Sequence, residues 1–305
     1  MSRTTVNTAD TPRAGVIGLG VMGAPMARHL ASTGTRVTAY DPAPSAARAV
    51  EGSGVTLVGD GAAVAAAADV LVCMVATPAQ ARGALLGAGD SPGALDSMRS
   101  GSVLVVMGTL GREPVRELAA AAADKGVGFV DAPVSGGVVR AGRGELLIMG
   151  SGDDASWAGA WPVLDALGDP VRRVGGEPGQ GQVVKLVNQL LCGVHIAAAA
   201  EALALAASMG VDVAETWETI RPGAAASFML DDRGGRMVTR SFDDVRSALD
   251  IFVKDMGLVA DAAERSGLDA VLASTARRVF EEASERGWGR QDDSGVIRWY
   301  EERGV

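Results

Sequence analysis

The chain is poor in cysteine and in aromatic residues. Only two cysteines, Cys73 and Cys192, occur among 305 residues, and neither belongs to a Cys-x-x-Cys pair or a Cys/His cluster. This scarcity excludes a disulfide-stapled scaffold and favours two buried, reduced thiols in a cytoplasmic protein. Because aromatic residues make up only 4% of the chain, we expect cores built from alanine, leucine and valine.

Positive charge and long apolar runs are also scarce. Lysine and arginine number 28 against 37 acidic residues, a net charge of −9 without a basic run. This balance argues against nucleic acid or an anionic membrane as a partner. The most apolar stretches are interrupted by Asp69 and Glu201, so no stretch reaches the roughly 18 apolar residues of a membrane span. Residues 1–13 are polar, without a signal-peptide pattern, and are expected to form a disordered tail.

The first half of the chain alternates short β-branched runs with alanine-rich segments. Runs such as Val70–Val75 are apolar on both faces, as in strands covered by helices on either side. The predicted strands are 15–18, 36–41, 70–75, 103–106, 128–131, 146–149 and 171–174. Strands and helices in alternation predict a Rossmann-type α/β fold with a doubly wound, mainly parallel sheet.

The second half has a different character. After a glycine-rich segment at 176–181, a helical pattern runs without proline from Gln182 to about Ser208, and only helical patterns follow it. A chain of 305 residues fits about two domains. We therefore predict a dinucleotide-binding domain over 14–176 and an all-helical domain for substrate binding and oligomerisation over 177–305, joined by a long interdomain helix.

A glycine motif follows the first predicted strand. Gly18, Gly20 and Gly23 form a Gly-x-Gly-x-x-Gly pattern, which allows a tight turn, close approach of a pyrophosphate and close packing of a helix. Asp41, at the end of the second strand, would accept hydrogen bonds from ribose hydroxyls and repel a 2′-phosphate. The pattern predicts a nicotinamide dinucleotide cofactor, with NAD preferred over NADP. The expected cofactor contacts here are Gly18, Leu19, Gly20, Val21, Met22, Gly23 and Asp41.

A serine and two glycines follow the predicted strand 128–131. The Ser135 hydroxyl and the backbone N–H groups of Gly136 and Gly137 could hold a carboxylate or a developing oxyanion. A purely structural turn would use the same residues, so this segment alone leaves both interpretations open.

A lysine lies in the first turns of the long helix. Lys185 has apolar neighbours, and Asn188 and Gln189 share its helix face. Desolvation would disfavour the charged amine and suit it to proton exchange as a general acid or base. The alternative is a lysine that extends from the helix edge to solvent.

Together these segments resemble the β-hydroxyacid dehydrogenase family, which includes 3-hydroxyisobutyrate dehydrogenase and tartronate semialdehyde reductase. The resemblance covers nearly the whole chain through GLGVMGAPMARHL, DAPVSGGVVRAGRGELLIMGSG, GQGQVVKLVNQ and DIFVKDMGLV, and it is closest to the L-threonate dehydrogenase branch. It implies an NAD-dependent oxidoreductase that transfers hydride between nicotinamide and a small hydroxy acid such as L-threonate. It also implies a homodimer or homotetramer.

The resemblance assigns roles to the remaining site residues. It makes Lys185 the catalytic acid/base and places Asn188 beside the substrate. It implies substrate binding by Ser135, Gly136, Gly137 and Gln189, and further cofactor contacts from Thr77, Thr109 and Lys254; it implies no metal. Three positions depart from the family pattern. His29 and Gln189 each replace an asparagine, and the change at Gln189 bears on substrate choice; Thr77 lies in an unusual Ala-Thr-Pro segment.

Several alternatives remain. The substrate could instead be that of 3-hydroxyisobutyrate dehydrogenase or of tartronate semialdehyde reductase. Imine reductases share the architecture but generally lack a lysine at the position of Lys185. A catalytically silent NAD-binding scaffold is the non-enzyme alternative, and the joint presence of Ser135, Lys185, Asn188 and Lys254 counts against it.

Overall fold

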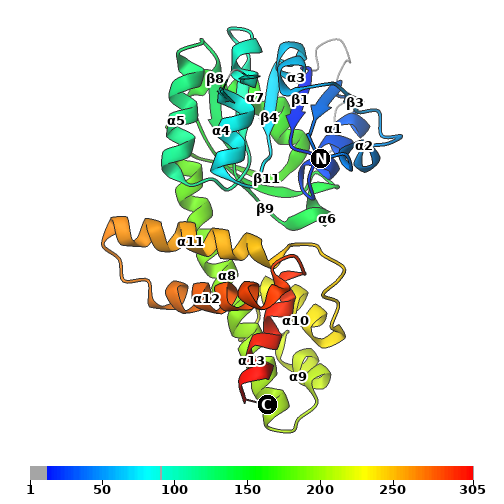
Figure 1. Cartoon of the computed structure of the whole chain (residues 1–305), viewed down its shortest axis with the longest axis vertical. Helices are drawn as coiled ribbons and strands as arrows, with labels where there is room; N and C mark the ends of the chain where they lie inside the picture. Colours follow the sequence, from blue (N-terminus) through cyan, green and yellow to red (C-terminus); the bar gives the residue numbers. More distant parts are fainter. Residues whose placement is uncertain (1–11, 90, 305) are drawn as a thin grey trace. The chain divides into compact units, whose positions relative to one another are not determined.

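A computed structural model describes residues 12–89 and 91–304, which form two compact units (Figure 1). The division falls after Lys185, inside a helix, whereas the sequence pattern places a boundary between 176 and 177. Most of the expected tail, 1–11, lies outside the described residues. Arg13 is held in unit 1, because its backbone N–H and its guanidinium both donate to the Asp69 carboxylate.

Unit 1 is built on a sheet with the strand order β11-β10-β8-β7-β4-β1-β2-β3, and β9 pairs with β10. The strands are β1 (Ala14–Ile17), β2 (Val37–Tyr40), β3 (Thr56–Leu57), β4 (Val70–Cys73), β7 (Val103–Val106), β8 (Gly128–Asp131), β9 (Val134–Ser135), β10 (Leu146–Ser151) and β11 (Gly168–Gly175). All seven predicted strands are present, and the fold class is confirmed. The chain order reverses between β1 and β4, and ligands bind outside the carboxyl ends of strands at such a switch point.

The shortest strands and one reversal of strand direction were not predicted from the sequence. β3, β9 and the hairpin of β5 (Gly87–Ala88) and β6 (Ser91–Pro92) have two residues per strand, too few to leave a pattern. β10 pairs antiparallel with β8 and β9. The helix between β9 and β10, α6 (Gly137–Ala141), has five residues, and a parallel return needs a longer crossover.

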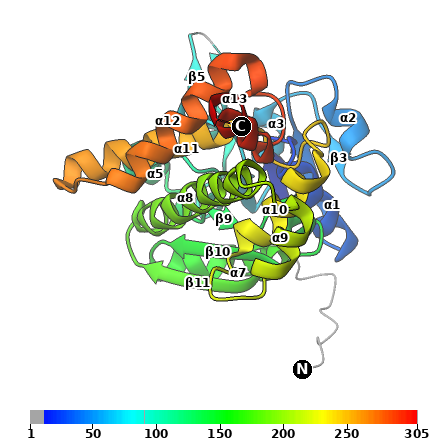
Figure 2. The same cartoon turned by 90° about the horizontal axis from the view of Figure 1, so that it is seen from below.

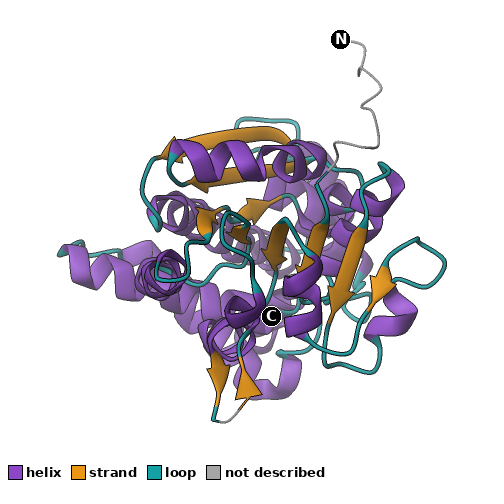
Figure 3. Cartoon of the chain, turned by 90° about the horizontal axis from the view of Figure 1, so that it is seen from above, coloured by secondary structure: helices purple, strands orange, loops and turns teal. Residues whose placement is uncertain are grey.

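Helices cover both faces of the sheet, whose strands are orange in Figure 3. One face packs against α1 (Gly23–Ser32), α6 and α7 (Asp154–Leu167), and the other against α3 (Gly61–Ala67), α4 (Pro78–Leu86) and α5 (Arg112–Ala123). A further short helix is α2 (Ala46–Ala49). Along β4, Val70 and Val72 enter the first core while Leu71 and Cys73 enter the second, which explains why the strand is apolar throughout.

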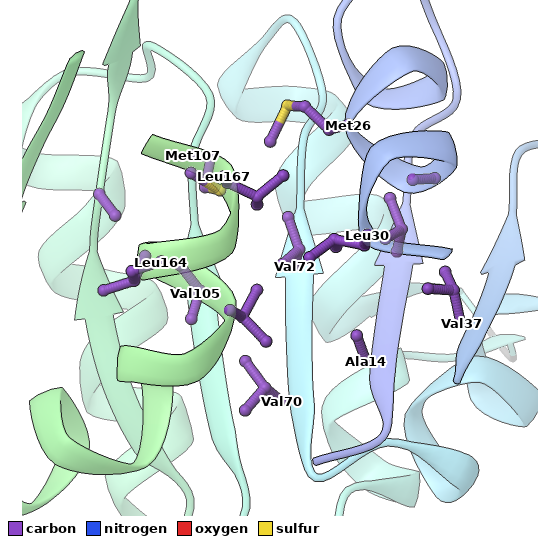
Figure 4. Packing of buried hydrophobic residues seen from close by; sticks show 14 of the residues in the cluster. Ala14, Met26, Leu30, Val37, Val70, Val72, Val105, Met107, Leu164 and Leu167 are labelled. Carbon is purple, nitrogen blue, oxygen red and sulfur yellow. The ribbon is translucent and has the colours of Figure 1, made fainter. Parts of the chain in front are cut away.

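The first core is aliphatic, as the composition predicts. Figure 4 shows Met26 and Leu30 of α1 and Leu164 of α7 directed at the strand residues Val72 and Val105. These side chains are fully buried. Burying a side chain of this size stabilises a fold by about 1.5–3 kcal/mol, so this layer of contacts fixes the helices on the strands.

Unit 2 consists of helices among the described residues, with one isolated β-bridge between Ala248 and Asp292. Its α-helices are the later part of α8 (Gln180–Ser208), then α9 (Val213–Ile220), α10 (Phe228–Thr239), α11 (Leu249–Ser266), α12 (Val271–Ala283) and α13 (Ile297–Gly304). A π-helical turn, η2 (Ser284–Trp288), and a 3₁₀ helix, η3 (Asp293–Val296), lie between α12 and α13. Figures 1 and 2 show α11 and α12 side by side. Phe252 stacks on Phe280 between them, with ring centroids 5.3 Å apart.

The long helix α8 begins two residues before its predicted start and ends at its predicted end. Within unit 2 it packs closely on α11, because a Cβ atom at Gly193 would lie 2.3 Å from the sulfur of Met256. By length and composition alone α8 could cross a membrane, a test that core helices of water-soluble proteins also pass.

Candidate active site

The glycine loop after β1 has the geometry that a dinucleotide requires. Gly18 has a φ of +95°, and a Cβ atom there would lie 2.4 Å from the carbonyl oxygen of Met74. At Gly23 a Cβ atom would lie 1.9 Å from the oxygen of Gly18, so this glycine lets α1 pack against the turn. A Cβ atom at Gly20 would meet nothing within 4 Å. The loop therefore leaves open the space beside Gly20, through which a pyrophosphate reaches the backbone.

The N-terminus of the helix that follows this loop presents a partial positive charge to an anion, although the backbone N–H of Ala24 already donates to the oxygen of Gly20 and Pro25 has no N–H. α1 begins at Gly23, and within the described residues no side chain caps its N-terminus. An uncapped N-terminus presents backbone N–H groups and a partial positive charge. Together with the open space at Gly20, it fits the pyrophosphate of a nicotinamide dinucleotide.

Asp41 lies directly after β2 and is joined to the glycine loop. One oxygen of its carboxylate accepts from the backbone N–H of Leu19 at 2.7 Å, and the other accepts from that of Ala43 at 2.8 Å. The side chain is partly exposed. Each carboxylate oxygen can accept more than one hydrogen bond, so both retain capacity for ribose hydroxyls.

Thr77 and Thr109 follow β4 and β7, whose carboxyl ends lie at the same sheet edge as the glycine loop. The Thr77 hydroxyl accepts from the backbone N–H of Gln80 at 3.2 Å and caps α4. This capping role explains Thr77 locally and leaves its hydroxyl hydrogen available as a donor. Thr109 is partly buried and lies between Gly108 and Leu110, both of which bond to Gln182.

Ser135, Gly136 and Gly137 form the turn between β9 and α6. Gly136 and Gly137 have φ angles of +134° and +72°, which a residue with a side chain would adopt only under strain. The side chain of Arg140 occupies the space beside Gly136, whereas a Cβ atom at Gly137 would meet nothing within 4 Å. The open side at Gly137 fits a ligand that approaches the backbone N–H groups.

The first turn of α8 is bonded to the sheet by buried polar groups. Asp131, at the end of β8, is fully buried, and its Oδ2 accepts from the backbone N–H groups of Gly179 at 3.1 Å and Gln182 at 2.9 Å. Its Oδ1 accepts from the side-chain amide of Gln182 at 2.8 Å. The hydroxyl of Ser151, at the end of β10, donates to Asp131 at 3.4 Å. Burial raises the pKa of the Asp131 carboxyl to about 6, although these donors oppose the shift.

Lys185 lies one helical turn beyond Gln182 on α8. Only 6% of this residue is exposed, which is uncommon for a lysine. Little of this residue thus contacts bulk water, in contrast to a lysine that extends from the helix edge to solvent. Its helix starts at the carboxyl edge of the sheet, where the glycine loop also lies.

In unit 2, four polar side chains form a connected chain. The Asn188 amide donates to Oε1 of Gln189 at 2.9 Å, and the Gln189 amide donates to the carboxylate of Asp255 at 2.5 Å. Asp255, on α11, is buried and pairs with Lys254 at 2.6 Å. Gln189 thus connects Asn188 to the Lys254–Asp255 pair, and its side-chain amide is engaged on both sides.

The two cysteines differ in their surroundings. Cys73 is buried in β4, and burial raises the pKa of its thiol to about 12, which makes it unreactive. Cys192 is only partly buried, so the expectation of two buried thiols is wrong for this residue. Its sulfur accepts a hydrogen bond from the amide of Asn188 at 3.4 Å.

Sequence reasoning gave no role to Asp131, Gln182 or Asp255. Asp131 opens the segment that contains Ser135, and Gln182 precedes Lys185 by one turn, but only the folded chain shows that the two are bonded. Across residues 12–89 and 91–304, no three histidine, cysteine or acidic residues are grouped as metal ligands would be.

Two family models match the chain. One, described as the NAD binding domain of 6-phosphogluconate dehydrogenase, matches residues 13–176. The other, described as the NAD-binding domain of NADP-dependent 3-hydroxyisobutyrate dehydrogenase, matches residues 179–300. The two matches span nearly all of the described residues.

Individual proteins are similar over almost the full length. L-threonate dehydrogenase of Escherichia coli K12 is 38% identical over 294 residues, 96% of each chain. The crystal structure of 3-hydroxyisobutyrate dehydrogenase from Salmonella typhimurium is 39% identical, with a TM-score of 0.88 over 94% of this chain and 99% of that one. Psf3 in complex with NADP⁺ and 2-OPP is 26% identical, with a TM-score of 0.85 over 93% and 99%.

Proposed function

Because the chain belongs to the 3-hydroxyisobutyrate dehydrogenase family of NAD(P)-dependent hydroxyacid dehydrogenases, we propose that it transfers hydride between NAD and a small sugar acid such as L-threonate. The 38% sequence identity to L-threonate dehydrogenase, which extends over 96% of both chains, supports this choice of substrate class. The glycine loop and Lys185 support this chemistry.

The glycine loop and Asp41 hold the cofactor in this proposal. The bound nicotinamide ring supplies the position that accepts or donates the hydride. The pyrophosphate binds beside Gly20, whose open side admits it, and the partial positive charge of the α1 N-terminus stabilises it. The Asp41 carboxylate accepts the ribose hydroxyls, and its charge opposes a 2′-phosphate, which supports NAD over NADP. Thr77, Thr109 and Lys254 are proposed as further cofactor contacts.

The substrate is held by its carboxylate and activated at its hydroxyl. Ser135, Gly136 and Gly137 donate to the carboxylate from the β9–α6 turn, and Asn188 binds the substrate one turn along α8 from the lysine. In oxidation, neutral Lys185 accepts the proton of the substrate hydroxyl as hydride leaves the carbon that bears this hydroxyl. In reduction, the Lys185 ammonium returns that proton to the developing alkoxide. The bond changes balance as one hydride and one proton.

The observation that carries this proposal is the burial of Lys185 on a helix bonded to the carboxyl edge of the sheet. A buried amine at a fixed place can exchange a proton with a bound substrate without competition from water. A solvated lysine would lack this property.

Replacement of the lysine tests the proposal. Lys185→Met should lower kcat by about 10²–10⁴, the usual contribution of general acid–base catalysis, and should leave the Kd of NAD unchanged. Lys125→Met is the matched control, because Lys125 lies in the same unit and pairs with Asp96 at the surface. A Lys185→Met enzyme that turns over at the wild-type rate would refute the mechanism.

A substrate panel separates the alternatives. NADH formation at 340 nm is followed with L-threonate, D-glycerate, 3-hydroxyisobutyrate and L-serine. A kcat/KM highest for L-threonate supports the proposed substrate, and a preference for 3-hydroxyisobutyrate or D-glycerate supports the corresponding relatives. No activity with any of the four, despite tight NAD binding, supports the silent scaffold.

We also propose that the protein is a cytoplasmic homodimer or homotetramer without a nucleic-acid or membrane partner. The net charge of −9 supports the exclusion of polyanions. Exposed apolar side chains on α8, among them Val187, Leu191 and Leu205, support association between copies. The mass in solution, measured by light scattering, decides between monomer, dimer and tetramer.

A further inference from the structure

The first turn of α8 has all of its backbone donors satisfied, two of them by strand ends. The first four N–H groups of a helix have no partner within the helix. In α8, those of Gln180 and Val183 donate to the carbonyl oxygens of Glu177 and Gly179, which precede the helix. That of Gly181 donates to the Ser151 hydroxyl at 3.0 Å, and that of Gln182 donates to Asp131. The helix is therefore capped by residues from β8 and β10 rather than by its own sequence.

Gln182 adds a second layer of contacts, and each atom of its amide is used. Its Nε2 donates to the carbonyl oxygen of Gly108 at 3.1 Å and to Asp131 at 2.8 Å. Its Oε1 accepts from the backbone N–H groups of Leu110 and Gly111 at 2.9 and 3.0 Å. Two donors and two acceptor sites are the full capacity of this side chain. Gln182 is fully buried, so no water replaces a lost contact.

The hydrogen-bond donors around position 131 favour a charged carboxylate, and burial opposes them. The groups that contact Asp131 are all donors: two backbone N–H groups, one side-chain amide and one hydroxyl. A negative charge beside the N-terminus of a helix is also favoured by the helix dipole. The backbone of α8 at Gly181 also lies close to Asp131, since a Cβ atom at Gly181 would lie 2.9 Å from the Asp131 carboxylate. These contacts hold the first turn of α8 against the ends of β8 and β10.

We propose that Asp131 and Gln182 are positioning residues that set the location of the Lys185 amine. Lys185 follows Gln182 by three residues on the same helix, so a slip or rotation of the first turn displaces the amine directly. Displacing a catalytic group by about 1 Å can cost roughly 10²-fold in rate. This inference rests on the proposed function of Lys185 and extends it to two residues that are fully buried.

A double-mutant cycle tests the inference. Gln182→Met keeps the length and burial of the side chain and removes its four hydrogen bonds. It should lower kcat by about 10–100-fold, while the KM of NAD stays within about twofold, because the amine is misplaced and the glycine loop is intact. In a Lys185→Met background the same substitution should change the residual rate by less than about twofold, since no amine remains to be positioned.

The outcomes of the cycle are distinct. Equal losses from Gln182→Met in both backgrounds would overturn the positioning role. An unchanged kcat in Gln182→Met alone would do the same. A wild-type rate in the single Lys185→Met enzyme would instead refute the proposed function itself, which separates the two failures.

A control and a milder variant guard against a loss of folding. Ser156→Ala removes another buried hydroxyl of unit 1, which donates to Asp153 and accepts from Phe129, and it should leave kcat unchanged. If Gln182→Met does not fold, Ser151→Ala removes only one cap of α8 and should lower kcat by about 2–10-fold. An unchanged kcat in a folded Ser151→Ala enzyme would then contradict the inference.

Discussion

The backbone N–H of Leu19 donates to the Asp41 carboxylate at 2.7 Å, and this bond joins the glycine loop after β1 to the end of β2. The same side chain therefore shapes the loop and places a negative charge beside it. A substitution at this position can separate the two effects, because asparagine still accepts a hydrogen bond but carries no charge.

Asp41→Asn should reduce the preference for NAD over NADP. A hydrogen bond to a charged group contributes about 1.5–3 kcal/mol, so we expect the ratio of kcat/KM for NAD to that for NADP to fall by roughly 10-fold or more. Asp60→Asn, at the N-cap of α3, is the control, because its carboxylate accepts from the backbone N–H of Ala63 and not from the glycine loop. An unchanged ratio in Asp41→Asn would show that this carboxylate does not select the cofactor.

Alanine substitutions at two glycines of one motif should affect different quantities, NAD affinity at Gly20 and stability at Gly23. Gly20→Ala adds a methyl group to open space, so the melting temperature should stay the same while the Kd of NAD rises by about 10-fold or more. Gly23→Ala places a methyl group against the oxygen of Gly18, so it should lower the melting temperature even without NAD. Calorimetry of both variants provides the two quantities. Unchanged NAD affinity in Gly20→Ala would contradict the proposed place of the pyrophosphate.

The Asp131 carboxyl should make stability depend on pH. Burial raises its pKa to about 6 from an ordinary value of 3.8. The folded state thus holds this proton more tightly, and the resulting stabilisation is complete below about pH 4 and lost as the pH rises through 6. The shift corresponds to an effect on the order of 3 kcal/mol.

Urea unfolding of the wild type and of Asp131→Asn from pH 4 to 7.5 measures this effect. The difference between the two free energies of unfolding isolates Asp131, because other carboxyls such as Asp153 have lowered pKa values and act in the opposite direction. As the pH rises, the free energy of unfolding of the wild type should fall relative to that of Asp131→Asn. Parallel curves would mean that this carboxyl titrates alike in the folded and unfolded states.

The sequence predicts the sheet of unit 1 well because burial on both faces leaves a local signature. Val70–Cys73 is apolar at every position, since alternate residues enter two different cores. The antiparallel return of β10 leaves no such signature, because strand direction depends on how the chain reverses through the short helix α6. Strands of two residues, such as β3, are too short for any periodicity.

The residues of the glycine loop are predicted from sequence because Gly18, Gly20 and Gly23 lie within one short segment, where their spacing alone identifies the motif. The partners of Gln182 and Gln189 are not, since each bonds to a residue more than fifty positions away. Local spacing indicates that Gln189 shares a helix face with Lys185. It does not show that its amide is already bonded to Asn188 and Asp255.

One unbroken helix carries Lys185 in its first turns and Asn188 three residues later, although the two residues fall in different compact units. The rise between them along the helix axis is about 4.5 Å, and it changes only if α8 itself bends or melts. The spacing between the proton-exchanging amine and the neighbouring amide is thus a property of the peptide backbone, insensitive to repacking of side chains in either core. Substitutions of the surrounding side chains can therefore change the substrate while the distance along the helix between Lys185 and Asn188 stays constant.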